Sequence, residues 1–373
     1  VMFKMATVCK KCKSFADTAE SQDLAAVCEK QPKFLQGLCL EMCPQRERDI
    51  REKQNRLHPF ERVEKNDVKR PADILVKEYS RPAAGKQLEP RDLRPAPVLV
   101  KTINYLLTDV LNKSRPWYYK CEFISDRIRS IRQDLTAQNI QNFEAVDILE
   151  KATRYYLVMA VTLCLEPRQN YDPVLHYTHT KECLKKLLDL YQLHKLNHYK
   201  SFRNEASFQA CDLILNLRNP DIFYRIVKLD NWLRKCKEIQ LAIQLIKLNM
   251  NGNFIGVFRA ASKLPFLESC AFFCNIQPIR CQGLSIMNTA FSSKKLSYPL
   301  TLLADNFYFD SYELAAEFCV THNILIKDKK VFFSKGQFIE AGQHKLCMCY
   351  KLVGSKMKSD ISDVILNHNA SSS

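Results

Sequence analysis

The sequence predicts a mainly α-helical protein in which amphipathic helices pack in pairs and stack into an array, with a small β-hairpin near the C-terminal end. Two observations favour this fold class. From about residue 99 onward, apolar residues recur at the spacing of one helix face, in segments of about three turns. Glycine is scarce, with eight in 373 residues, and neither GxGxxG nor GxxxxGKS/T occurs, which argues against nucleotide-binding α/β folds. Such short helix pairs cannot bury their apolar faces alone, so neighbouring pairs must stack.

The same pattern divides the chain into five segments. Residues 1–36 are polar and irregular and are predicted to be flexible, whereas residues 37–98 are charged and interrupted by prolines. A stretch without its own core must lie on another part of the protein or stay mobile, and we interpret 37–98 as an extended arm that packs on the array. The helical-repeat array is predicted over 99–282, a winged-helix module over 283–341 and a flexible tail over 342–373.

Each helix is predicted from its own apolar stripe. Ile124, Ile128, Ile131 and Leu135, for example, fall at i, i+4, i+7 and i+11 on one face. The other predicted helices are 45–57 in the arm, 143–165, a stripe at 184–191, 205–217, 238–250, 253–263, 266–276, 282–291, 300–307 and 312–320.

The end of the array has the element order of a winged helix. The helix at 312–320, with Asp310 or Ser311 as its N-cap, follows the helix at 300–307. Two β-branched or aromatic runs come next, and the charged segment Lys327–Lys330 between them is typical of a hairpin turn. Two helices followed by a hairpin are the order expected of a winged helix.

The charge of the chain favours a negatively charged partner. The formal net charge is +16, and a broad basic surface attracts polyanions. The second helix of the module carries Glu313 and Glu317 but no lysine or arginine, so base reading in a DNA major groove is not expected. The lysines around the hairpin are candidates for contact with a nucleic-acid backbone, and the alternative is an ordinary solvated turn. These candidates are Lys294, Lys295, Lys327, Lys329, Lys330 and Lys335.

The cysteines and apolar runs indicate a reducing compartment. The 16 cysteines are scattered, mostly within apolar patterns. The N-terminal residues show no apolar segment with a cleavage site, so secretion is not expected. The longest apolar run, Tyr155–Leu165, is about half of the ~20 residues that a membrane span needs, so no membrane association is expected.

The stretch GLCLEMCPQRERDIRE at 37–52 raises the question of a metal site. Cys39 and Cys43 would need two further ligands to bind zinc, and Cys9 and Cys12 are available. A redox pair is a weaker alternative, because no βαβ unit surrounds these cysteines.

We favour a packing role for the same stretch. Leu38, Leu40 and Met42 would join the two thiols, which behave as small hydrophobes, in an apolar plug that docks the arm. Pro44 is then expected at the first position of the following helix.

Charged residues at 126–134 lie on the helix with the isoleucine stripe. Asp126, Arg129 and Gln133 share one face. We interpret this run as an ion-pair network that holds the arm, because acidic partners stand in the same helix. The alternative is contact with RNA phosphates, which suit the arginine fork.

The motif VKEYSR at 76–81 is expected to anchor the arm, with Tyr79 inserted and with Lys77 and Arg81 in solvent. The alternative is that it binds a phosphate.

A second weak metal pattern stands at His176, His179, Glu182 and Cys183, which recur at helical spacing. The preferred interpretation is ordinary surface histidines.

Several of these stretches resemble, in order, the Sac-three/GANP family (GANP is germinal-centre-associated nuclear protein). They are GLCLEMCPQRER, VKEYSR, LRPAPVL and DRIRSIRQDLTAQ, and the likeness covers roughly 37–341. The chain is most similar to the small stand-alone members. The resemblance implies a PCI-like array of TPR-like helix pairs capped by a winged helix, and structural roles for motif residues. These residues are Cys39, Met42, Cys43, Pro44, Glu47, Arg48, Tyr79, Arg81, Arg94, Pro95, Trp117, Asp126, Arg127, Arg129, Arg132 and Asp134.

The resemblance also implies partners and a role. In the family this region pairs with a PCI-domain protein and a small acidic subunit, and it presents a basic surface to RNA or other nucleic acid. The expected role is a non-catalytic scaffold, either in nuclear mRNA export coupled to transcription or in centrosome duplication and mitotic spindle assembly. The expected location is the nucleus, centrosome or spindle, with a cytosolic pool. The alternative function is a stand-alone nucleic-acid-binding regulator that uses the basic wing.

The sequence contains no signature of catalysis. Neither GxSxG, HExxH nor a paired catalytic carboxylate motif occurs, so we expect no enzyme activity and no cofactor.

Overall fold

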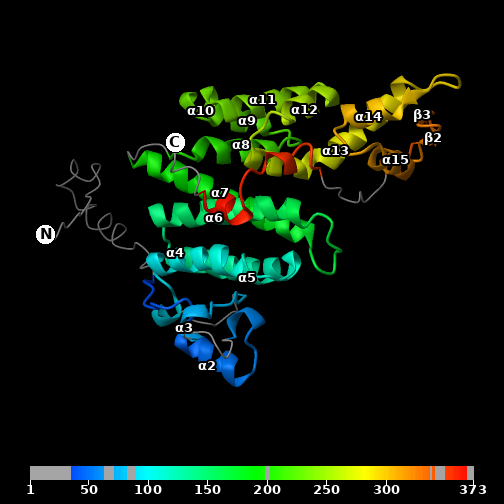
Figure 1. Ribbon diagram of the computed structural model, residues 1–373. Helices are drawn as coiled ribbons and strands as arrows, with labels where there is room; N and C mark the ends of the chain where they lie inside the picture. Colours follow the sequence, from blue (N-terminus) through cyan, green and yellow to red (C-terminus); the bar gives the residue numbers. More distant parts are fainter. Residues whose placement is uncertain are drawn as a thin grey trace, which may run out of the picture.

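A computed structural model describes residues 35–62, 71–81, 89–197, 202–336, 338–340 and 349–367. Over these residues the protein is mainly helical. The helices form an elongated stack, and a small antiparallel sheet lies at the end remote from the N-terminal helices (Figure 1). None of the described helices combines the length and the hydropathy needed to cross a bilayer.

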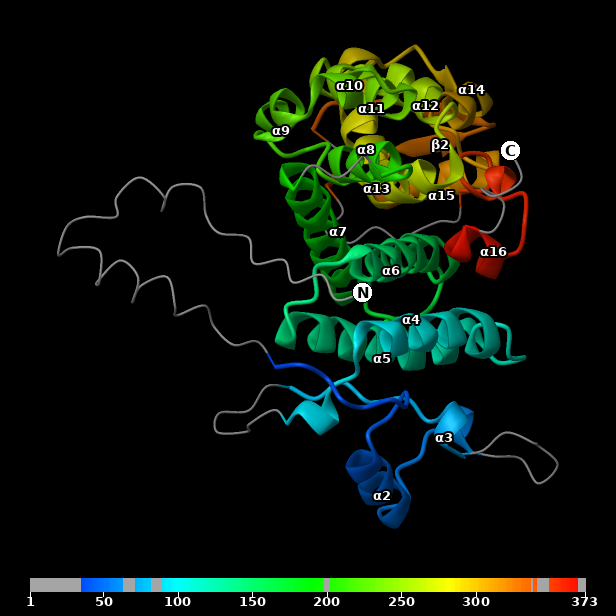
Figure 2. The same ribbon diagram turned by 90° about the vertical axis from the view of Figure 1, so that its left-hand side faces the viewer.

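The arm lies beneath the first long helices of the stack (Figure 2). Prolines start most of its short elements, since proline is tolerated at the first turn but not further into a helix. The elements are α2 (Gln45–Lys53), the 3₁₀ turn η2 (Pro59–Glu61), α3 (Pro71–Ile74) and the 3₁₀ turn η3 (Pro90–Asp92).

The array begins at α4, and its helices pack mainly on their neighbours in the stack. Its elements are α4 (Ala96–Tyr105), the π-helical turn η4 (Leu106–Val110), α5 (Trp117–Ala137), α6 (Phe143–Thr162), α7 (Pro173–Leu196), α8 (Glu205–Leu215), α9 (Ile222–Lys228), α10 (Asn231–Lys235), α11 (Lys237–Met250), α12 (Phe254–Ala261) and α13 (Phe266–Ala290). One apolar core runs through the stack and includes Met42 from the arm. The arm therefore shares the core of the array.

Helix α13 differs from the sequence prediction. Two helices were expected, at 266–276 and 282–291, but the structure has one helix with Pro278 inside it. Ile276 and Ile279, on either side of this proline, are both buried in the core. Packing on both sides of Pro278 outweighs its cost of about 3 kcal/mol in a helix interior.

The last module contains helices and three short strands. They are β1 (Tyr298–Pro299), α14 (Leu300–Asn306), α15 (Tyr312–Thr321), β2 (Leu325–Lys327) and β3 (Lys330–Phe332). The sheet order is β1-β3-β2, with both pairs antiparallel. The predicted hairpin is confirmed, and its two turn residues, Asp328 and Lys329, have φ values of 51° and 57°. Two left-handed residues suit a tight hairpin turn. Strand β1 was not predicted, because two residues carry no alternating pattern.

The prediction of a flexible tail is wrong for residues 349–367. Asp310 accepts hydrogen bonds from the N–H groups of Tyr350 (2.6 Å) and Lys351 (2.8 Å). The chain then forms the 3₁₀ turn η5 (Gly354–Lys356) and the helix α16 (Ile361–Leu366), which returns to pack on α6 and η4 (Figure 2). Ile365 is fully buried there. A six-residue helix has too short a stripe to be recognised before its docking surface is known.

Candidate functional site

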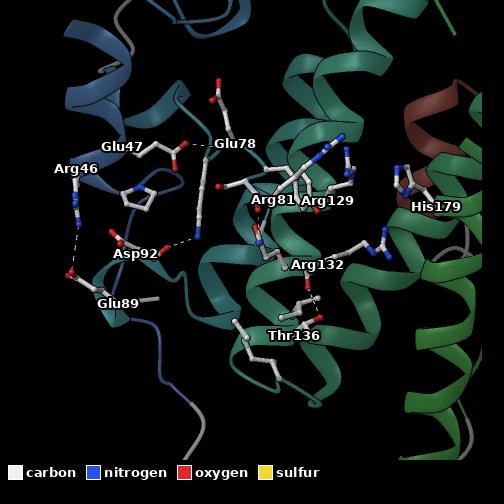
Figure 3. Close-up of a pocket in the computed structure, with 18 of the residues that line it drawn as sticks. Arg46, Glu47, Glu78, Arg81, Glu89, Asp92, Arg129, Arg132, Thr136 and His179 are labelled. Atoms are coloured by element: carbon white, nitrogen blue, oxygen red, sulfur yellow. Dashed lines mark hydrogen bonds and ion pairs between the residues drawn. The ribbon is translucent and has the colours of Figure 1, made fainter. Parts of the chain in front are cut away.

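A cleft of about 1290 Å³ separates part of the arm from the array. Its walls come from α2, the extended segment 77–81, α5 and α7 (Figure 3). Beside this cleft, two buried ion-pair networks connect the arm to α5.

The first network is centred on the buried carboxylate of Asp134. Its Oδ1 accepts a hydrogen bond from Lys77 Nζ (2.7 Å) and its Oδ2 from Arg94 Nε (2.7 Å). Arg94 also donates to Met42 O (3.1 Å) and to Ser130 Oγ (2.9 Å). The expectation that Lys77 lies in solvent is wrong, since Lys77 is buried and supplies one of the two positive charges that compensate Asp134.

The second network joins Arg51 and Arg127 to two glutamates. Arg51 pairs with buried Glu61 and, at 3.1 Å, with Glu78. Arg127 Nη2 lies 3.2 Å from Glu61 Oε1 and 3.4 Å from Glu78 Oε1. Arg127 also pairs with Asp126. Sequence reasoning missed Arg51 and Glu61, because no periodic pattern links Glu61 to Arg51 across the loop after α2 or to Arg127 on α5.

One face of α5 holds the extended segment by further polar contacts. Asp126 Oδ2 accepts the N–H of Tyr79 (3.2 Å), and Gln133 Nε2 donates to Ser80 O (2.8 Å). The Arg129 guanidinium carbon lies 3.9 Å from the centre of the Tyr79 ring. This face of α5 therefore hydrogen-bonds to the backbone of the arm, and the Tyr79 side chain is half-buried there.

Other motif residues also hold the arm or begin a helix. Glu47 accepts the N–H of Glu78 (2.8 Å), and Arg48 is buried and pairs with Glu41. Arg81 is exposed, as expected.

Three further motif residues stand at the starts of helices. Pro44 is the N-cap of α2 and not its first residue as expected, and Pro95 is the N-cap of α4. Trp117 is the first residue of α5, and the Lys120 ammonium lies over its ring.

The apolar plug is smaller than predicted. Cys39, Met42 and Cys43 are buried, but Leu38 and Leu40 are 65% and 78% exposed. Successive side chains of an extended chain point to opposite sides, so the leucines face away when the residues between them face inward.

Within the part of the chain that the structure describes, the two cysteines of the arm are buried as packing residues. Burial raises the pKa of both the Cys39 and the Cys43 thiol, whereas zinc binds thiolates. Cys9 and Cys12 lie outside the described residues. Within the described ranges, no group of three or more His, Cys, Asp or Glu side chains is placed to hold a metal ion.

The six candidate lysines lie together around the hairpin, and all six are exposed. Lys327 and Lys330 are paired in the register of β2 and β3. The N–H of Lys335 donates to Ser292 Oγ (3.0 Å), which brings the loop with Lys294 and Lys295 to the end of the hairpin. The sheet and the loops beside it thus carry a cluster of lysines, with Asp328 in the turn among them, far from the arm (Figure 1).

Comparison with known proteins decides the family. The family model for SAC3/GANP proteins matches residues 42–328, from the buried methionine of the arm to the turn of the hairpin. The chain belongs to the SAC3/GANP family.

Curated relatives agree with this SAC3/GANP assignment. SAC3 family protein 1 of Schizosaccharomyces pombe is 30% identical over 78% of this chain and 30% of its own length. Protein xmas of Drosophila melanogaster is 26% identical over 88% of this chain and 16% of its own length. SAC3 family protein B of Arabidopsis thaliana is 25% identical over 89% and 20%. The chain thus spans less than a third of the length of each of these relatives.

The histidines of this SAC3/GANP chain differ from the preferred interpretation, since His176 and His179 are buried and not on the surface. His176 Nε2 lies 2.8 Å from Tyr156 O, to which a neutral ring donates. Burial lowers the pKa of His176 to about 4, below the value of about 6.5 in an unfolded chain.

This shift predicts a loss of stability in acid. Between pH 6.5 and 4 the unfolded chain binds a proton at His176 and the folded chain does not, so stability present above pH 6.5 is lost as the pH falls. At pH 7 the wild type should be more stable than His176→Gln. That gap should narrow by about 2–3 kcal/mol at pH 4. Urea unfolding of both proteins at the two pH values measures it, and a constant gap would contradict the prediction.

Proposed function

We propose that this SAC3/GANP chain is a non-catalytic scaffold that pairs with a PCI-type partner and acts in nuclear mRNA export coupled to transcription. The observation that carries the proposal is the element order α13, β1, α14, α15, β2, β3 at the end of a helical stack. This order, with the sheet order β1-β3-β2, supports a winged-helix module. Stacked helix pairs capped in this way support a PCI-like fold.

The module exposes apolar side chains that are available to a partner. Leu302 on α14, Val320 on α15 and Leu325 on β2 are 46%, 62% and 63% exposed. Strand β2 is at an edge of the sheet, so its outer backbone groups lack a strand partner within the described residues. Exposed apolar side chains beside an open strand edge are typical of a protein interface.

The lysine cluster supports contact with RNA. Helix α15 carries Glu313 and Glu317 and no basic residue, whereas the six lysines surround the neighbouring hairpin. Backbone contacts of this kind position a nucleic acid without reading its sequence. A small acidic subunit is a second partner that this surface suits.

Affinity purification from dividing cells, with the full chain as bait, tests the pairing. We expect a PCI-domain protein that stays bound in about 0.5 M NaCl, where charges are screened within a few ångström. The double change Val320→Glu and Leu325→Glu should abolish its recovery, and Val174→Glu, on the exposed side of α7, should not. Co-purified nuclear-pore export factors support the export role. Centrosomal proteins in their place would favour a role at the centrosome and spindle.

The wing lysines give a second prediction. Changing Lys327, Lys329 and Lys330 to glutamate should weaken binding of a fluorescent oligouridine at least about tenfold in 0.1 M salt, since ion release drives such binding. Each lost phosphate contact lowers the magnitude of the slope of log K against log salt by about 0.7, so the loss of three contacts should lower it by about 2. A matched triple variant at Lys228, Lys235 and Lys237, which are also exposed, should bind like the wild type. If the wing variant and the matched variant bound oligouridine with equal affinity, the wing would be excluded as the contact.

The exposed lysines also keep the second candidate function open, a stand-alone nucleic-acid-binding regulator. It predicts affinity that falls steeply with salt and no salt-resistant PCI-domain partner.

A further inference from the structure

We propose that the cleft between the arm and the array binds a phosphorylated serine or threonine in an extended segment of a partner protein. The cleft is larger than the usual range for small-molecule pockets, about 300–1,000 Å³, which favours a polypeptide segment.

Cations line both sides of the cleft, and Arg46, Arg51, Arg56 and Lys77 are among those on the arm side. Arg129 and Arg132 come from α5, Arg81 from the arm and Lys186 from α7 (Figure 3 labels the three arginines). Among the described residues no carboxylate lies within 4.0 Å of the Arg81 or Arg129 side-chain nitrogens. One face of the Arg129 guanidinium rests on the Tyr79 ring, which holds it in place and leaves its N–H donors for a ligand.

A carboxylate of the protein already shows how an anionic oxygen is held here. Glu182 Oε2 accepts a hydrogen bond from Arg132 Nη2 (2.8 Å) and lies 3.3 Å from His179 Nδ1. A phosphate monoester has three terminal oxygens and a charge near −2, so it can engage the guanidinium groups of Arg129 and Arg132 together.

The rest of the lining favours a peptide over RNA. Glu47, Glu78, Glu89 and Asp92 line the arm side of the cleft together with Arg46, Arg51 and Arg56, so this side offers no uniform positive charge to a continuous polyanion. Apolar side chains including Leu135, Ile140 and Leu149 also line the cleft and suit an apolar residue beside the phosphate. A peptide can match this mixed lining, because only one of its residues needs to be strongly negative.

The test uses the full chain and two degenerate peptide libraries that differ only in a central phosphoserine or serine. We expect the phosphoserine library to be retained at least about tenfold better, since charge-assisted hydrogen bonds are about twice as strong as neutral ones. Arg129→Gln with Arg132→Gln should remove this preference. The matched pair Lys228→Gln and Lys235→Gln, which loses the same charge on α9 and α10, should keep it.

The outcomes are distinct. Equal retention of both libraries, no retention of either, or a preference that survives in the double arginine variant would overturn the proposal. Displacement of the bound phosphopeptides by oligouridine from the wild type and from the wing triple variant would show that the cleft is an RNA site instead. Arg129→Lys alone, which keeps the charge but loses the fork, should retain part of the preference and guards against a folding defect in the double variant.

Discussion

Replacing Asp134 by asparagine is expected to lower the free energy of unfolding by about 3–5 kcal/mol. Asp134 is fully buried and is the ion-pair partner of both Lys77 and Arg94. Its loss leaves two buried cations without a compensating charge. The desolvation cost of these cations, which the carboxylate now offsets, becomes the cost of the substitution.

Urea unfolding and limited proteolysis measure this effect. The arm should also become sensitive to protease, because Lys77 and Arg94 lie on it and Asp134 lies on α5. The control is Asp147→Asn, which removes the half-exposed partner of Lys151 and should cost no more than about 0.5 kcal/mol. If the two variants lose similar stability, the Asp134 network does not hold the arm.

The second large effect is expected for Arg280→Met, at about 3 kcal/mol. Arg280 lies buried on α13, where its Nε donates to Phe307 O (3.1 Å) and its Nη2 to Tyr308 O (2.7 Å). Its guanidinium carbon lies 3.7 Å from the centre of the Phe309 ring. Methionine fills part of the space but removes the donor to Phe307 O and leaves Tyr308 O only the weak donor Cys349 Sγ (3.4 Å).

Release of the C-terminal segment is the specific readout for Arg280. Its Nη2 lies 3.7 Å from Cys349 Sγ, so this side chain joins α13, the end of α14 and the returning segment 349–367. The segment should become accessible to carboxypeptidase and the unfolding midpoint should fall. Arg259→Met, at an exposed position of α12, should change stability by no more than about 0.5 kcal/mol. A protected segment in the Arg280 variant would contradict this account.

Most long helices of the array are predictable from their apolar stripes. The helix predicted at 143–165 is α6 and that at 205–217 is α8. In the last module the helix predicted at 312–320 is α15. The C-terminal ends of these helices differ from the prediction by one to three residues. The hairpin is predictable as well, because its strands and its turn have local signatures. Errors occurred where distant packing decides, as at Pro278 and at Lys77, whose surroundings come from the core and from α5.

By itself, the sequence determined the helical class, the order of the elements, the basic lysine cluster and the family motifs, because each depends on residues close together in the chain. Only the tertiary structure decided which charges are buried, how the arm and the C-terminal segment dock, and that a cleft forms over α5. Those features depend on pairs such as Lys77 with Asp134 or Arg280 with Cys349, whose separation in the chain leaves no periodic trace.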